Sequence, residues 1–161
     1  LFGTCRGLST NCVNRGDVES VNTYAPADAK KSAAAGIAGF GGGSTEGCEN
    51  YGKVTISQTE GPVAASAFLG VVGNTAMTHV GATVKCDVVS DNGIAVLIAG
   101  QNNNAKTLTL GTAEAPIVIE GVTLNGAAVT AENLAETLAT STEEANVANI
   151  VYEIGTTVVV K

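Results

Sequence analysis

The sequence has little of what most enzymes and nucleic-acid-binding proteins use. It contains no Trp, three Tyr, three Phe and one His, and only 14% of its 161 residues are charged. Lys and Arg number 8 against 15 Asp and Glu, a net charge of −7, and only Lys30 and Lys31 are adjacent. Nucleic acids and anionic membranes attract clustered basic residues. No apolar run approaches the roughly 20 residues of a membrane-spanning helix. We therefore expect neither a nucleic-acid partner nor insertion into a membrane.

The groups that perform acid–base and nucleophilic catalysis are equally scarce. His79 would have to serve any Ser-His-Asp or Cys-His mechanism, but it lies within an apparent strand and no Gly-x-Ser-x-Gly motif accompanies it. Asp87 with Asp91, and Glu143 with Glu144, are the candidate carboxylate pairs for glycoside hydrolysis. The first pair flanks a turn and the second suits a helix start. We expect no enzyme and no cofactor.

Metal sites are weakly indicated. Asp87, Asp91 and Asn92 could supply oxygens to Ca²⁺, but the spaced acidic loop of a calcium site is missing, which favours a plain turn. The cysteines lack the close pair that is typical of structural zinc sites. We expect no bound metal.

Four cysteines, an even number, are compatible with two disulfides in an oxidising compartment. Proximity in the sequence favours Cys5 with Cys12 and Cys48 with Cys86, while four reduced thiols are the alternative. The chain begins at Leu1 and its single Met is Met77, so we expect that a leader is removed by processing.

From about residue 51 the chain is dominated by short β-type segments separated by turns. Apolar residues make up 45% of the sequence and are mostly small or branched. The Ser90–Gly93 turn between two β-branched runs predicts a hairpin, since Asn and Gly readily supply positive φ. The predicted strands cover 53–58, 63–72, 78–89, 94–100, 105–110 and 116–124, and Asn125-Gly126 is a further turn. The pattern predicts a mainly β fold, an antiparallel sandwich or partly closed barrel.

The flanking regions look different. Residues 1–23 have little periodicity and predict an irregular N-terminal arm. Residues 26–35 have helix-forming composition, and six of the twelve residues from 36 to 47 are Gly, which indicates a linker or a loop where backbones approach closely. We expect one domain over 1–161, with the arm, a short helix and the Gly-rich loop in 1–50 and a β-rich body in 51–161.

Near the C-terminus the pattern predicts two short helices, over 131–139 and 142–154. The first has an N-cap at Thr130, and the second has a capping box followed by apolar residues at helical spacing, for which a strand is the alternative. The chain then ends in an apolar strand that could pair with a neighbouring subunit: Thr156, Thr157, Val158, Val159 and Val160.

In composition the chain resembles subunits of extracellular filaments, such as bacterial fimbrial and archaeal pilins. It is acidic, low in charge and rich in Gly, Ala, Thr, Val and Asn. The resemblance implies a self-assembling subunit at the cell surface, in which a strand of one copy (156–160 or the arm 1–23) pairs with the next copy. The alternatives are a virion structural protein, for instance a phage capsid decoration or tail component, and a secreted adhesin or binding module.

Overall fold

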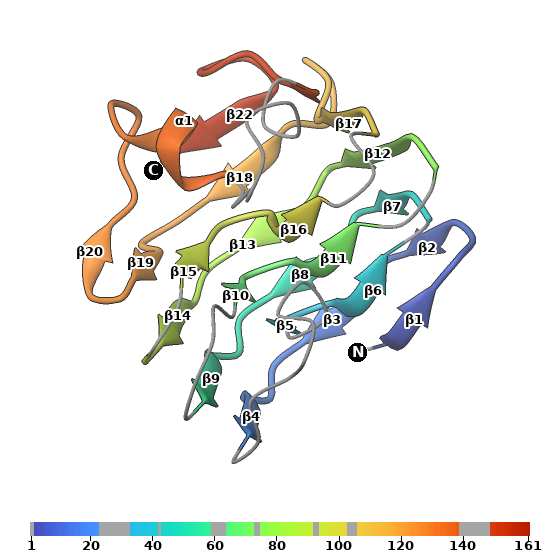
Figure 1. Cartoon of the computed structure of the whole chain (residues 1–161). Coiled ribbons are helices and arrows are strands. Elements are labelled where there is room, and N and C mark those ends of the chain that lie inside the picture. The colour runs from blue at the N-terminus through green and yellow to red at the C-terminus, as the bar shows by residue number, and fades with distance from the viewer. Residues whose placement is uncertain are drawn as a thin grey trace.

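The computed structural model describes residues 2–22, 33–41, 43–58, 64–72, 75–91, 94–102, 106–138 and 149–161. The chain winds through successive coils of short strands, and each strand lies beside the equivalent strand of the next coil (Figure 1). Five sheets result, which we call A to E. All their strand pairs run parallel except one.

Sheets E and A form one side of each coil. Sheet E contains β5 (Ala33–Ala35), β10 (Ala64–Ser66) and β15 (Ile94–Val96). Sheet A contains β1 (Phe2–Cys5), β6 (Ala38–Gly41), β11 (Leu69–Val72) and β16 (Ala99–Asn102).

The chain then passes through sheets B, C and D. Sheet B contains β2 (Ser9–Thr10), β7 (Thr45–Glu46), β12 (Met77–Val80), β17 (Leu108–Leu110) and β21 (Ile150–Val151). Sheet C contains β3 (Val13–Asn14), β8 (Glu49–Asn50), β13 (Thr83–Val84), β18 (Ile117–Ile119) and β22 (Val158–Val160). Sheet D contains β4 (Val18–Asn22), β9 (Val54–Gln58), β14 (Asp87–Ser90), β19 (Thr123–Leu124) and β20 (Ala127–Ala128).

The predicted antiparallel sandwich or barrel is therefore wrong. The predicted hairpin around Asp91 is wrong for the same reason, because β14 and β15 belong to different sheets. Val88 pairs with Val54 of the preceding coil and Leu124 of the following one, both in parallel. The six predicted strands contain β9 to β19, but four of them are divided into two or three short strands that belong to different sheets. The partners of these strands are one coil away in the sequence rather than across the nearest turn.

The predicted N-terminal arm is also wrong, because residues 2–22 contain the four strands β1 to β4 of the first coil. The predicted helix 26–35 falls largely outside the described residues, and its last three residues form β5. The Gly-rich stretch contains β6 and β7. The close backbone approach expected there is present, because a Cβ on Gly43 would lie 1.9 Å from the Gly7 carbonyl oxygen.

One helix is described, α1 (Leu134–Thr137), which is shorter than the predicted 131–139. Most of the second predicted helix, 142–154, lies outside the described residues. Its end is wrong, because Ile150–Val151 is β21 and Ile154 forms a parallel bridge with Val158. The Asn125-Gly126 turn is confirmed. Both residues have positive φ (48° and 82°), and they join β19 to β20 in the antiparallel pair.

The interior of the coils is filled by stacks of aliphatic side chains. In sheet D the inward positions of successive coils are Val54, Val88 and Leu124, all buried. Because parallel pairing holds equivalent residues in register, each apolar side chain packs on its counterpart in the next coil. The result is one continuous core along the stack.

Candidate assembly surfaces

The lateral faces of the stack carry polar pairs that join neighbouring coils. The Asp91 carboxylate accepts a 2.6 Å hydrogen bond from the Ser57 hydroxyl, and the Asp87 carboxylate accepts one of the same length from Thr123. Asp87 and Asp91 thus bond to different coils, and their contacts are structural. Asn92, Glu143 and Glu144 lie outside the described residues. In the parts of the chain that the structure describes, no group of three or more His, Cys, Asp or Glu could hold a metal ion.

His79 is fully buried in β12. Its Nδ1 shares a 2.9 Å hydrogen bond with the Thr45 hydroxyl, and its ring contacts Phe68 edge to face at 5.5 Å between centroids. Nε2 has no hydrogen-bond partner among the described residues. Burial lowers the pKa of His79 to about 4, so the ring is neutral at pH 7 and belongs to the core.

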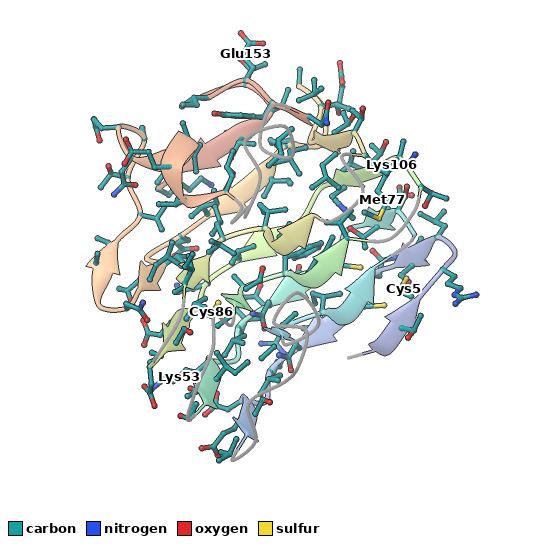
Figure 2. All side chains as sticks on the ribbon, in the orientation of Figure 1. Cys5, Lys53, Met77, Cys86, Lys106 and Glu153 are labelled. Atoms are coloured by element: carbon teal, nitrogen blue, oxygen red, sulfur yellow. The ribbon has the colours of Figure 1, made fainter. Side chains whose placement is uncertain are left out.

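The four cysteines are all free thiols in the structure. Cys5 lies in β1, where its sulfur is 3.0 Å from the Ser9 hydroxyl, and Cys86 lies two coils away, where it accepts a 3.3 Å hydrogen bond from the Asn50 amide (Figure 2). Cys48 lies on the coil next to Cys12. Neither Cys5 with Cys12 nor Cys48 with Cys86 is joined.

The two ends of the stack expose unpaired strand edges. β2 and β3 are the outermost strands of sheets B and C at the first-coil end, and β21 and β22 are the outermost strands of the same sheets at the last-coil end. An edge strand in a parallel sheet directs half of its N–H and C=O groups away from its partner. Both ends therefore present main-chain groups that another strand could bind.

Large apolar side chains are exposed only near these ends, within the described residues. Six such side chains are between 42% and 65% exposed. Three are on the first coil, one is on the outermost strand of sheet E, and two are on the last coil: Leu8, Val13 and Val21; Ile94; Val151 and Ile154. The inner coils carry none in the described ranges. Exposed apolar side chains beside an unpaired edge are typical of contact surfaces.

The segment containing α1 covers one corner of the last-coil end. The backbone N–H groups of Leu97 and Ile98 donate to the carbonyls of Thr137 and Leu138, at 2.7 and 2.9 Å. In inner coils the equivalent donors bond to the following coil, as Ile37 does to Phe68. Leu134 and Leu138 are buried over this corner. The segment thus takes the place of a fifth coil over sheets E and A.

The terminal strand predicted to pair with another subunit has a partner within the chain. Val158, Val159 and Val160 form β22, which pairs in parallel with β18. Its other side is the outer edge of sheet C, where Val158 already bonds within the chain: its N–H donates to the Glu153 carbonyl at 3.1 Å, and its carbonyl accepts from the Gly155 N–H at 2.8 Å. Thr156 and Thr157 precede it in a turn. Sequence reasoning identified this segment, and the alternative that it gave, residues 1–23, contains Val13 at the opposite edge of the same sheet.

The fold and its two open ends define the class of the molecule, a parallel β-solenoid with a covering segment at one corner. No family model, curated protein or solved structure matches the chain. The only helix described is too short to cross a membrane.

Proposed function

We propose that the protein is a structural subunit that assembles end to end into an extracellular filament. The last coil of one copy stacks on the first coil of the next. In this arrangement β22 lies beside β3, and β21 beside β2, so that sheets B and C continue from copy to copy. The contact joins two different surfaces, and such a head-to-tail contact extends into a filament when its rotation does not close.

The observation that carries this proposal is the distribution of exposed apolar side chains. Leu8 and Val13 flank the open strands at one end, and Val151 and Ile154 flank those at the other, on the same two sheets. Stacking would remove these four side chains from water and pair those edge groups that are free. On β22 this excludes Val158, because its N–H and carbonyl already bond to Glu153 and Gly155. Burial of apolar area contributes roughly 25 cal/mol per Å², and parallel pairing fixes the register.

None of the residues in β2, β3, β21 or β22 is charged, which favours the same arrangement. Val13 and Val151 stand at edges where soluble β proteins usually place Lys or another charged residue to prevent association. Here the charged pair Lys85–Glu120, with 2.7 Å between Nζ and Oε1, lies on the lateral face instead.

The test uses a lysine at either end and a matched lysine on the lateral face. Val13→Lys and Val151→Lys should each abolish filaments in electron microscopy and give monomers in sedimentation velocity. Thr78→Lys, on the exposed side of the inner strand β12, should assemble like the wild type. Circular dichroism checks that all three variants keep their fold. Wild-type protein that stays monomeric at every concentration would refute the proposal.

Mixing the two end variants distinguishes a head-to-tail contact from a symmetric one. Val13→Lys retains an intact last coil, and Val151→Lys retains an intact first coil, so an equimolar mixture should form heterodimers that cannot grow further. If the contact instead joined two first coils, Val151→Lys alone would still dimerise. That result would replace the filament by a closed dimer.

A further inference from the structure

Two cysteines occupy equivalent positions on adjacent coils. Cys12, Asn14 and Gly16 recur as Cys48, Asn50 and Gly52, which are 36 residues further on. The structure stacks these segments in register, because Val13 pairs with Glu49 and Asn14 with Asn50. The Glu49 N–H also donates a 2.8 Å hydrogen bond to the Cys12 carbonyl. Cys12 and Cys48 are therefore neighbours across the coil-to-coil contact.

This placement suits a disulfide. Strands paired in a sheet lie about 4.8 Å apart, and disulfides join Cα atoms that are about 4.4–6.8 Å apart. Residues in register on parallel strands direct their side chains to the same side, and Cys12 is among the groups that raise the pKa of Cys48. The geometry needs no change of backbone register to bring the sulfurs together.

The other two cysteines have different neighbours. Cys5 contacts Ser9, and the Cys86 sulfur accepts a hydrogen bond from Asn50. Cys48 also directs its thiol to the Ser9 carbonyl at 3.5 Å, while Cys12 bonds its own coil at the Thr10 carbonyl. Among the described residues, Cys12 and Cys48 are the one pair of cysteines that occupies equivalent positions on adjacent coils.

We propose that Cys12 and Cys48 form a disulfide that fastens the first coil to the second when the protein meets a small-molecule disulfide such as oxidised glutathione. Cys12 is the more exposed of the two, and its thiolate attacks one sulfur of the oxidant and releases a first thiol. The Cys48 thiolate then attacks Cys12 Sγ and releases the second thiol. The two protein thiols are oxidised, the oxidant is reduced, and both thiol protons end on the released thiols.

The rate of the second step, in which Cys48 attacks Cys12, should depend on pH. Burial is the main cause that raises the pKa of Cys48, and the neighbouring Cys12 adds to it. Little Cys48 is therefore ionised at neutral pH, and because the thiolate is the attacking form, closure should accelerate as the pH rises toward 9.

Peptide mapping after oxidation gives a direct test. Cleavage after Lys and Arg places the four cysteines in four different peptides, which end at Arg6, Arg15, Lys53 and Lys106. The oxidised full-length chain, blocked with an alkylating reagent before digestion, should give one linked pair, residues 7–15 with 32–53. The Cys5 and Cys86 peptides should be alkylated. A link between any other two peptides, or none after prolonged oxidation, would overturn the proposal.

Variants separate the disulfide from general effects of oxidation. Oxidation should raise the melting temperature of the wild type by about 10 °C, since a loop of this length is closed in the unfolded chain. Cys12→Ser should abolish this increase. Cys5→Ser, which changes a cysteine of the same coil, should retain it. An increase that survives in Cys12→Ser, or one that Cys5→Ser abolishes, would contradict the assignment.

Discussion

Asn50 shows how a single buried side chain links three coils. Its amide nitrogen donates to the Ala67 carbonyl at 2.8 Å, and its amide oxygen accepts from Asn14 at 2.8 Å and from the Gly52 N–H at 3.2 Å. The residue has no exposure to solvent. A buried polar group that is fully bonded in this way is costly to disturb, because its partners cannot turn to water instead.

Asn50→Ala should therefore lower the free energy of unfolding by about 3 kcal/mol, from the partners left unsatisfied and the small cavity. Urea denaturation of the wild type and the variant measures the difference. Asn14→Ala should cost less, because Asn14 bonds only Asn50 and the Gly16 N–H. The double variant should lose less than the sum of the two, since one bond is shared. Strict additivity would contradict the coupling.

His79 makes stability depend on pH. Its pKa is lowered to about 4 in the folded chain by burial, against about 6.5 in an unfolded one. The folded state favours the neutral ring, so the contribution is complete above pH 6.5 and is lost as the pH falls toward 4. Between these values the free energy of unfolding should drop by about 3 kcal/mol from this residue.

Urea denaturation at a series of pH values measures this loss. His79→Gln is the control, because it retains the carboxylates of the chain and removes the titrating ring. The difference in slope between wild type and variant, from pH 7 to pH 4, isolates His79. If both proteins lose stability in parallel, the buried ring is not the cause.

At the scale of elements, the turn from sheet B to sheet C is built alike in three coils. Asn11, Gly47 and Gly81 each hold positive φ, at 53°, 61° and 61°. Each N–H donates to the following coil, to the carbonyls of Glu46, Val80 and Ala115 in turn. Gly and Asn are the residues that adopt this conformation at least cost.

Gly81→Ala should destabilise the protein by about 1–2 kcal/mol through backbone strain. A Cβ there would meet no heavy atom closer than 3.7 Å, so crowding is not the cause. Gly81→Asn should cost clearly less, because the first coil uses Asn11 at the same position. Thermal unfolding of both variants provides the comparison. Equal losses would mean that the conformation of the turn does not decide the effect.

The sequence was sufficient to locate the β-rich stretch from residue 53 to 124, but it revealed neither the strands before that stretch nor the partner of each strand. β-branched residues mark β14 and β15 clearly, and a turn with Asp91, Asn92 and Gly93 suits a hairpin as well as a corner of a coil. The alternation of apolar and polar residues indicates which face of a strand is buried, but it does not identify the strand that pairs with it. The pairing of Val88 with Val54 and Leu124 depends on residues that are 34 and 36 positions away.

The signal that could have revealed the coils is the recurrence of Cys12-x-Asn14-x-Gly16 at Cys48-x-Asn50-x-Gly52. A fixed period of this kind indicates a solenoid. The equivalent segments of the later coils have other residues at these three positions. The repeat is therefore visible in the sequence only between the first two coils. The end surfaces were still less predictable. In the sequence, Val13 and Val151 look like ordinary strand residues. Only the order of the strands shows that β3 and β21 are the outermost described strands of their sheets.

At the scale of the whole molecule, each coil contacts mainly the coils beside it. In such a stack, stability is approximately a sum of coil terms and nearest-neighbour terms. The end coils have one neighbour and the inner coils two.

Amide hydrogen exchange should therefore be slowest in the inner strands β9, β13 and β14 and fastest in β2, β3 and β21 of the monomer. Mass spectrometry of short peptic peptides can follow this exchange. Assembly should slow exchange in β2, β3, β21 and β22 and leave β9 and β14 unchanged. Added protection confined to β9 and β14 would place the contact on a lateral face instead.

The parallel register of the coils also decides how the molecule would yield to force. The hydrogen bonds between coils run along the direction in which the coils are stacked, and the two ends of the described chain belong to the first and last coils. A pull applied to the two termini therefore loads these bonds a few at a time, and the coils would peel away in sequence rather than rupture together. A covalent link between the first two coils would move the starting point of that peeling to the opposite end.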